Sequence, residues 1–144
     1  MISLNWFWLS VLALVFWGIT GVTQKLSTDR ISTQLSFLGF SVAFLPIAAW
    51  VMLSFPVDLH ISLGVLLLGA AGGALNGLGT LASFAAFESG GKASVVIPIV
   101  SLYPLVTVLG ARIFFQEQIS NTQWAGILLA PLAAWLLSCD STAE

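Results

Sequence analysis

Charged residues divide this chain into five long uncharged runs, and no other feature restricts its fold as strongly. The runs are residues 1–24, 31–57, 59–87, 93–111 and 118–139. A helix of about 20 apolar residues spans the hydrocarbon core of a bilayer. Because each run has about this length, we expect an all-α integral membrane protein that crosses the membrane with five transmembrane helices.

The composition excludes a soluble domain and several classes of function. Of the 144 residues, 58% are hydrophobic and 7% are charged, whereas about 25% of an ordinary soluble domain is charged. The four basic residues are scattered, so we expect no nucleic-acid partner. Membrane lipid is an expected partner. Cys139 is the only cysteine and His60 the only histidine. We therefore expect no disulfide, no metal site and no cofactor.

The start of the chain has no basic residue, since neither Lys nor Arg occurs within residues 1–24. A secretory signal peptide would carry positive charge there. We therefore expect the first run to stay in the membrane as a helix of a single domain, residues 1–139, followed by a disordered polar tail at 140–144. The expected helices are 6–24, 34–55, 61–87, 94–115 and 123–138.

Prolines interrupt several of these helices. A proline in a helix removes a backbone donor and clashes with the preceding turn, so it kinks or breaks the helix. In hydrocarbon, the freed carbonyl groups need neighbouring helices, hydroxyls or water as partners. We expect kinks at Pro46, Pro98, Pro104 and Pro131.

The fourth run is the one that we expect to face the interior of a helical bundle. It contains both Pro98 and Pro104, and Ser101, Tyr103 and Thr107 supply polar atoms around the predicted break. Tyr103 offers an aromatic surface together with a hydroxyl that could orient a ligand. We expect these three polar residues to line a substrate cavity.

A stripe of small and polar residues follows one face of the first helix. Trp17, Thr20, Gly21 and Gln24 recur at helical spacing. Such a stripe either packs against a neighbouring helix or lines a cavity. We take Trp17 and Thr20 as candidates for the cavity. Lys25 either carries a charge at the cavity mouth or extends to the lipid headgroups.

The third helix carries the strongest packing signal. Gly69, Gly73 and Gly77 form two overlapping GxxxG spacings, which let another helix approach closely. On the same helix, Asn76 places a carboxamide in apolar surroundings, where it either bonds to another helix or contacts a ligand. We include Asn76 among the substrate-binding candidates. The glycines also support an alternative function, a non-transporting membrane subunit that docks a partner through this helix.

The sequence Glu88-Ser89-Gly90-Gly91-Lys92 predicts a tight turn between the third and fourth helices, because glycine permits a positive φ. Glu88 and Lys92 could pair across this turn. A second interpretation gives Glu88 a role in proton coupling. No carboxylate lies inside the five runs, although a carboxylate inside the membrane is the usual proton carrier.

The basic residues give the orientation. Lys25, Arg30 and Lys92 lie in connections on one side of the predicted bundle, and Arg112 lies on the other side. The positive-inside rule places the first three in the cytoplasm and the N-terminus outside. The margin is two charges, so dual insertion with copies in both orientations is an alternative.

Residues 87–120 resemble the helix 3 to helix 4 region of the drug/metabolite transporter superfamily, in its EamA-like branch. The resemblance rests on Leu102-Tyr103-Pro104, on Gln116-Glu117-Gln118, and on Phe16-Trp17-Gly18 followed by Lys25. It departs from the family at Gln118, where a basic residue is usual. It also departs in having one five-helix unit where most relatives carry two in tandem.

The resemblance implies half of an inverted-repeat, ten-helix transporter fold in a bacterial-type plasma membrane. The implied function is a secondary transporter that moves a small organic metabolite or drug-like solute. Two units with an odd number of helices insert in opposite orientations when they are fused head to tail, and so form an inverted repeat. A single unit needs a second, inverted copy from another chain. We therefore expect a homodimer, or a heterodimer with a second five-helix unit. An enzyme is not expected, because the sequence offers no convergent cluster of His, Cys or acidic residues.

Overall fold

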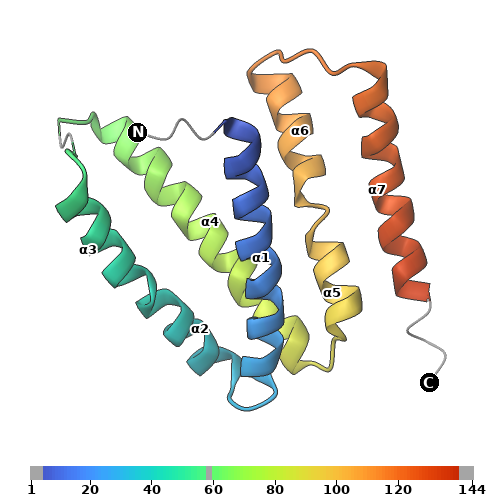
Figure 1. The fold of residues 1–144 in the computed structure, drawn as a ribbon, viewed down its shortest axis with the longest axis horizontal. Coiled ribbons are helices and arrows are strands. Elements are labelled where there is room, and N and C mark those ends of the chain that lie inside the picture. The colour runs from blue at the N-terminus through green and yellow to red at the C-terminus, as the bar shows by residue number, and fades with distance from the viewer. Residues whose placement is uncertain (1–4, 58–59, 140–144) are drawn as a thin grey trace. The chain divides into compact units, whose positions relative to one another are not determined.

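A computed structural model describes residues 5–57 and 60–139, and these residues form α-helices and connecting turns without strands (Figure 1). The predicted tail at 140–144 and Asp58 lie outside the described residues. The chain divides into two compact units, Met1–Ser89 and Gly90–Glu144. The helices are α1 (Trp6–Thr28), α2 (Thr33–Val42), α3 (Phe44–Ser54), α4 (Leu63–Glu88), α5 (Ala93–Val100), α6 (Tyr103–Phe114) and α7 (Asn121–Cys139).

Four segments are long and apolar enough to cross a membrane. They are Trp6–Thr28, Thr33–Ser54, Leu63–Glu88 and Ala93–Phe114. The protein is therefore a multi-pass integral membrane protein. Helix α7, with 19 residues and no charged side chain, lies where the fifth crossing is predicted but is not among these four. A fifth crossing stays a prediction.

The second segment is divided into α2 and α3 at Ala43, where the sequence alone predicts one kinked helix. The backbone N–H of Ala43 still bonds to the carbonyl of Gly39, at 3.2 Å. Pro46 follows three residues later and has no N–H to offer to the carbonyl of Val42. The missing donor and the bulk of the proline ring account for a break in the turn that precedes Pro46.

The fourth segment is likewise divided, and α5 ends at Val100 while α6 begins at Tyr103. The N–H of Leu102 bonds to the carbonyl of Ile99, three residues back, at 3.1 Å. Pro104 lies in the first turn of α6 and cannot donate to the carbonyl of Val100. The regular i to i−4 ladder is therefore interrupted over Ser101 and Leu102.

Serine residues begin several of these helices. The hydroxyl of Ser32 accepts from the N–H of Leu35, and that of Ser62 accepts from the N–H of Val65, each at 3.4 Å. Before α7, the Ser120 N–H donates to Gln123 Oε1 at 2.8 Å, while the Gln123 N–H donates to Ser120 Oγ at 3.3 Å. This reciprocal pair is a capping box, and it satisfies two backbone donors at the start of α7.

Unit 1 is built from α1, α2, α3 and α4, and Figure 1 shows α1 and the α2–α3 segment on either side of α4. Helix α4 packs against both α1 and α2. In unit 2, α5 packs against α7. The turn that follows α4 contains Gly90 with φ +93°, a conformation that suits glycine.

The distribution of side chains is inverted relative to a soluble protein. Among the described residues, the buried hydrophobic side chains are Phe84, Phe87 and Ala134, while large apolar side chains cover the outside of every helix. Lipid solvates such an exterior, so apolar burial does not by itself drive these helices together. Close packing and internal hydrogen bonds must hold them.

Phe87 is 1% exposed and is the largest fully buried side chain in the described part. We expect Phe87→Ala to lower the free energy of unfolding by about 3 kcal/mol, because it leaves a cavity where α4 packs. Thermal unfolding of the purified protein in detergent measures this loss. The matched control is Phe114→Ala, which truncates a side chain that is 81% exposed and should change stability by less than about 0.5 kcal/mol. Equal losses in both variants would contradict the prediction.

Candidate functional site

Unit 1 contains a cluster of buried polar side chains, which we call the polar junction. Its members come from the end of α1, the start of α2 and the second half of α4. They are Gln24, Thr33, Ser36, Thr80 and Ser83, and none is more than 8% exposed. A buried polar group needs a hydrogen-bond partner, so each of these side chains calls for one.

Two contacts tie the helices together at the polar junction. The Ser27 hydroxyl on α1 donates to Ser36 Oγ on α2, at 2.6 Å. The Thr33 N–H, at the start of α2, donates to Glu88 Oε2 at the end of α4, at 3.2 Å. A carboxylate at a helix N-terminus is stabilised by the helix dipole and by the free N–H groups of the first turn. Glu88 thus fastens the end of α4 to α2.

A pocket of about 240 Å³ adjoins the polar junction, between α1, α2 and α4. Polar groups of α1 and α2 form one part of its wall, and aliphatic and aromatic side chains form the rest. The lining residues are Thr23, Gln24, Ser27, Ile31, Leu35, Ser36, Gly39, Phe40 and Phe84. None of them is charged.

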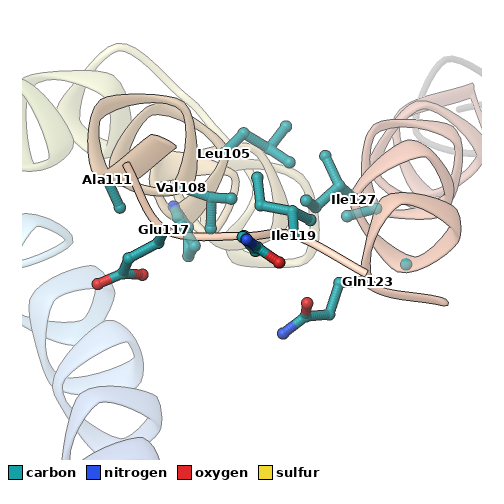
Figure 2. Close-up of a pocket in the computed structure, with 11 residues that line it drawn as sticks. Leu105, Val108, Ala111, Glu117, Ile119, Gln123 and Ile127 are labelled. Atoms are coloured by element: carbon teal, nitrogen blue, oxygen red, sulfur yellow. The ribbon is translucent and has the colours of Figure 1, made fainter. Parts of the chain in front are cut away.

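A second pocket, of about 400 Å³, lies in unit 2 between α6 and α7. Figure 2 shows Leu105, Ile119 and Ile127 converging on its centre, whereas the Glu117 carboxylate points away from them. Arg112 Nη1 donates to the Glu117 carbonyl at 3.2 Å, which holds the connection between the two helices in place. The interior of this pocket is therefore apolar and its rim is polar.

The substrate-binding candidates of α1 and α4 lie outside the lining of both pockets. Trp17 is exposed on α1, and the Thr20 hydroxyl donates to the Phe16 carbonyl of its own helix at 2.9 Å. Lys25 Nζ pairs with Asp29 Oδ1 at 2.9 Å. Asn76 is exposed on α4. Their assignment to one substrate cavity stays a prediction.

The candidates of the fourth segment lie at the break between α5 and α6 or just after it. Ser101 occupies the break itself, and Tyr103 is 63% exposed in this chain. The Thr107 hydroxyl is directed back to the Tyr103 carbonyl, at 3.4 Å. The three residues thus share one exposed region of unit 2, and their contact with a substrate is likewise a prediction.

The predicted glycine stripe is open over most of its length. A Cβ atom at Gly69 or at Gly73 would meet no atom within 4 Å, while one at Gly77 would lie 3.9 Å from Cζ of Phe37 on α2. Gly77 thus lies where α2 approaches α4. The role of the other two glycines in packing stays a prediction.

Sequence reasoning missed most of the pocket in unit 1. Gln24 belongs to the polar stripe of α1, so a signal for it existed. Nothing in the sequence connects it with Ser36 or with Phe84, because these residues are far apart along the chain. The Glu88 contact with Thr33, 55 residues away, was also invisible, since the turn beside Glu88 suggested Lys92 as a local partner.

The arrangement of the helices by itself identifies the class of protein. Four apolar segments of bilayer length, two of them divided into shorter helices, define a multi-pass helical membrane protein. Within the described residues no group of three or more His, Cys, Asp or Glu side chains could hold a metal ion.

A family model, that of the EamA-like transporter family, matches residues 4–139. The chain belongs to this family. The match indicates a membrane transporter function and does not favour the alternative of a docking subunit. No curated protein and no solved structure matched the chain.

The contact between Glu88 and Thr33 leads to a stability prediction. Glu88→Ala removes an acceptor at the start of α2 and should cost about 1 kcal/mol of unfolding free energy, as loss of a helix cap does. Glu88→Gln keeps an oxygen acceptor and should cost less. Unfolding of the detergent-solubilised protein by added SDS measures both. Glu117→Ala is the control, and a loss there equal to that of Glu88→Ala would contradict the capping role.

Proposed function

We propose that this chain is one half of a secondary transporter that moves a small organic metabolite or drug-like solute across a bacterial-type plasma membrane. A second five-helix unit in the opposite orientation completes the carrier, and alternating access moves the solute. The observation that carries this proposal is the match of a transporter family over residues 4–139, nearly the whole chain.

The break between α5 and α6 supports a solute path along the fourth segment. A membrane helix with an interrupted hydrogen-bond ladder exposes backbone carbonyls, and such backbone is tolerated where it lines a cavity or contacts other protein. The polar residue Ser101 lies at this interruption, and Tyr103 and Thr107 follow it in the first part of α6. In transporters with inverted repeats, broken helices form the substrate site near the midplane.

The exposure of Tyr103 supports the need for a second unit. Tyr103 is 63% exposed in this chain, and a phenol in apolar surroundings favours a hydrogen-bond partner for its hydroxyl. A second, inverted unit over this region would provide such partners and enclose the cavity.

Energy coupling in this proposal uses Glu88. Its carboxylate accepts from the Thr33 N–H, and a proton on the carboxylate would weaken that contact and loosen the end of α4 from α2. Proton binding would thus be linked to the relative position of two helices.

A pH gradient should accelerate uptake by the wild-type protein and leave uptake by Glu88→Gln unchanged.

Transport tests the role of Tyr103. The purified protein is reconstituted in liposomes and tested for uptake of radiolabelled amino acids, sugars, nucleosides and amines. For each solute that the wild type transports, Tyr103→Ala should lower the initial rate at least tenfold, because it removes both an aromatic surface and a hydroxyl from the cavity. Phe114→Ala, also an aromatic truncation on α6, should retain the wild-type rate. No flux of any solute would oppose the transporter proposal, and unchanged uptake by folded Tyr103→Ala would remove Tyr103 from the site.

Topology tests the inverted dimer. In a Cys139→Ser background, Gln34→Cys places one thiol at the start of α2, where Gln34 is exposed. An inverted homodimer should react with a membrane-impermeant maleimide to about half completion from either side of the membrane. Complete labelling from one side alone would rule out the homodimer and leave a heterodimer with a second five-helix unit.

A further inference from the structure

The uncharged pocket of unit 1 contains a polar side chain that the rest of the chain leaves unsatisfied. Gln24 is 8% exposed and lines the pocket. Its backbone carbonyl accepts from the Thr28 hydroxyl at 3.2 Å, and its side-chain amide has no partner among the hydrogen bonds of the described residues. A carboxamide has two donor hydrogens and an acceptor oxygen. Among the described residues, the fully enclosed side-chain atom without a partner is Thr33 Oγ1, so the Gln24 amide keeps some accessible surface. Because Gln24 lines the pocket, a partner for its amide can be placed there.

Ser36 adds a second unfilled position beside the amide. It is 4% exposed, and its oxygen accepts the hydrogen of the Ser27 hydroxyl at 2.6 Å. A serine hydroxyl can donate one hydrogen bond while it accepts others. The contact between the two hydroxyls uses one hydroxyl hydrogen, so the Ser27–Ser36 pair keeps the other one for a molecule in the pocket that both residues line.

The uncharged lining of the pocket disfavours the binding of ions. No lining residue is charged. Lys25, next to Gln24 in sequence, pairs with Asp29 at 2.9 Å, and Glu88 accepts from the Thr33 N–H at 3.2 Å. A charged ligand would lose its hydration without gaining a counter-charge, which is costly in an apolar environment. The pocket therefore suits an uncharged molecule.

The remaining wall is apolar and partly aromatic. Phe40 and Phe84 meet edge to face, with ring centroids 6.0 Å apart and an interplanar angle of 72°, and Leu35 adds an aliphatic surface. The volume of about 240 Å³ lies below the range of pockets for drug-sized ligands, about 300–1,000 Å³. The ligand is thus small, with one hydrogen-bonding end and one apolar end.

We infer that this pocket binds a small uncharged primary carboxamide. The ligand amide and the Gln24 amide match each other, since each offers an N–H to the carbonyl oxygen of the other, and the Ser27–Ser36 pair can donate its remaining hydroxyl hydrogen to the same ligand oxygen. The apolar part of the ligand lies against Phe40 and Phe84. The inference concerns binding and does not require that the protein transports this molecule.

Equilibrium binding of radiolabelled benzamide to the full chain in detergent tests the inference. We expect saturable binding, with one site per chain. Benzoate has nearly the same shape but is charged at pH 7, so it should compete at least tenfold more weakly than unlabelled benzamide. No saturable binding, as expected if only water occupies the pocket, or equal competition by benzoate would overturn the inference.

Two substitutions separate a role in binding from a role in folding. Gln24→Leu should weaken benzamide binding at least tenfold, because it removes the donors and the acceptor together. Gln34→Leu makes the same change at an exposed position outside the pocket and should leave binding unchanged. Gln24→Leu should keep or raise the melting temperature, because it replaces a buried amide that has no protein partner. Unchanged binding, or a fall in melting temperature together with the loss of binding, would overturn the assignment.

These outcomes are independent of transport. Benzamide binding that depends on Gln24 would stand even if the reconstituted protein moved no solute. Conversely, the protein could show flux that depends on Tyr103 and yet bind no benzamide. That result would overturn the carboxamide site and leave the proposed function intact.

Discussion

Hydrogen bonds at the polar junction, together with close helix packing, hold unit 1 together. Lipid solvates the apolar exterior as well as another helix would, so burial of hydrophobic surface contributes little to helix association in a membrane. Helices α1, α2 and α4 each carry buried polar groups that need hydrogen-bond partners. Partners on a neighbouring helix favour association of the three helices. The Ser27–Ser36 bond and the Glu88 contact with Thr33 satisfy part of that set across helix boundaries. Removal of such contacts leaves polar groups of the junction without their protein partners, which costs free energy for those that are buried.

Proline supplies the second constraint, because it limits how far each membrane segment can continue as one helix. Both Thr33–Ser54 and Ala93–Phe114 are long enough to cross a bilayer, yet each consists of two shorter helices. The breaks precede Pro46 and Pro104 by a few residues, since the lost donor and the steric clash both act on the preceding turn. A segment made of two short helices can bend at one point without losing the rest of its hydrogen bonds. Such bending is what the proposed transport cycle requires of the fourth segment.

The two pockets differ in what they can recognise. The pocket between α6 and α7 is apolar inside and polar only at its rim. The pocket of unit 1 has an unsatisfied amide and a serine pair in its wall, so it can select for the direction and number of hydrogen bonds. A site that hydrogen-bonds its ligand discriminates strongly against analogues that lack those groups. For this reason the smaller pocket is the better candidate for a specific ligand within a family of solute transporters.

The sequence by itself determined that this is a helical membrane protein, the turn at Gly90 and the resemblance to EamA-like transporters. These properties follow from charge spacing, length and local motifs. Only the tertiary structure placed Gln24 beside Ser36 and Phe84, and Glu88 beside Thr33. The physical reason is that helices that are apolar on all sides carry no hydrophobic periodicity to distinguish their inner faces from their outer ones. Which polar groups meet inside such a protein is decided when the helices pack.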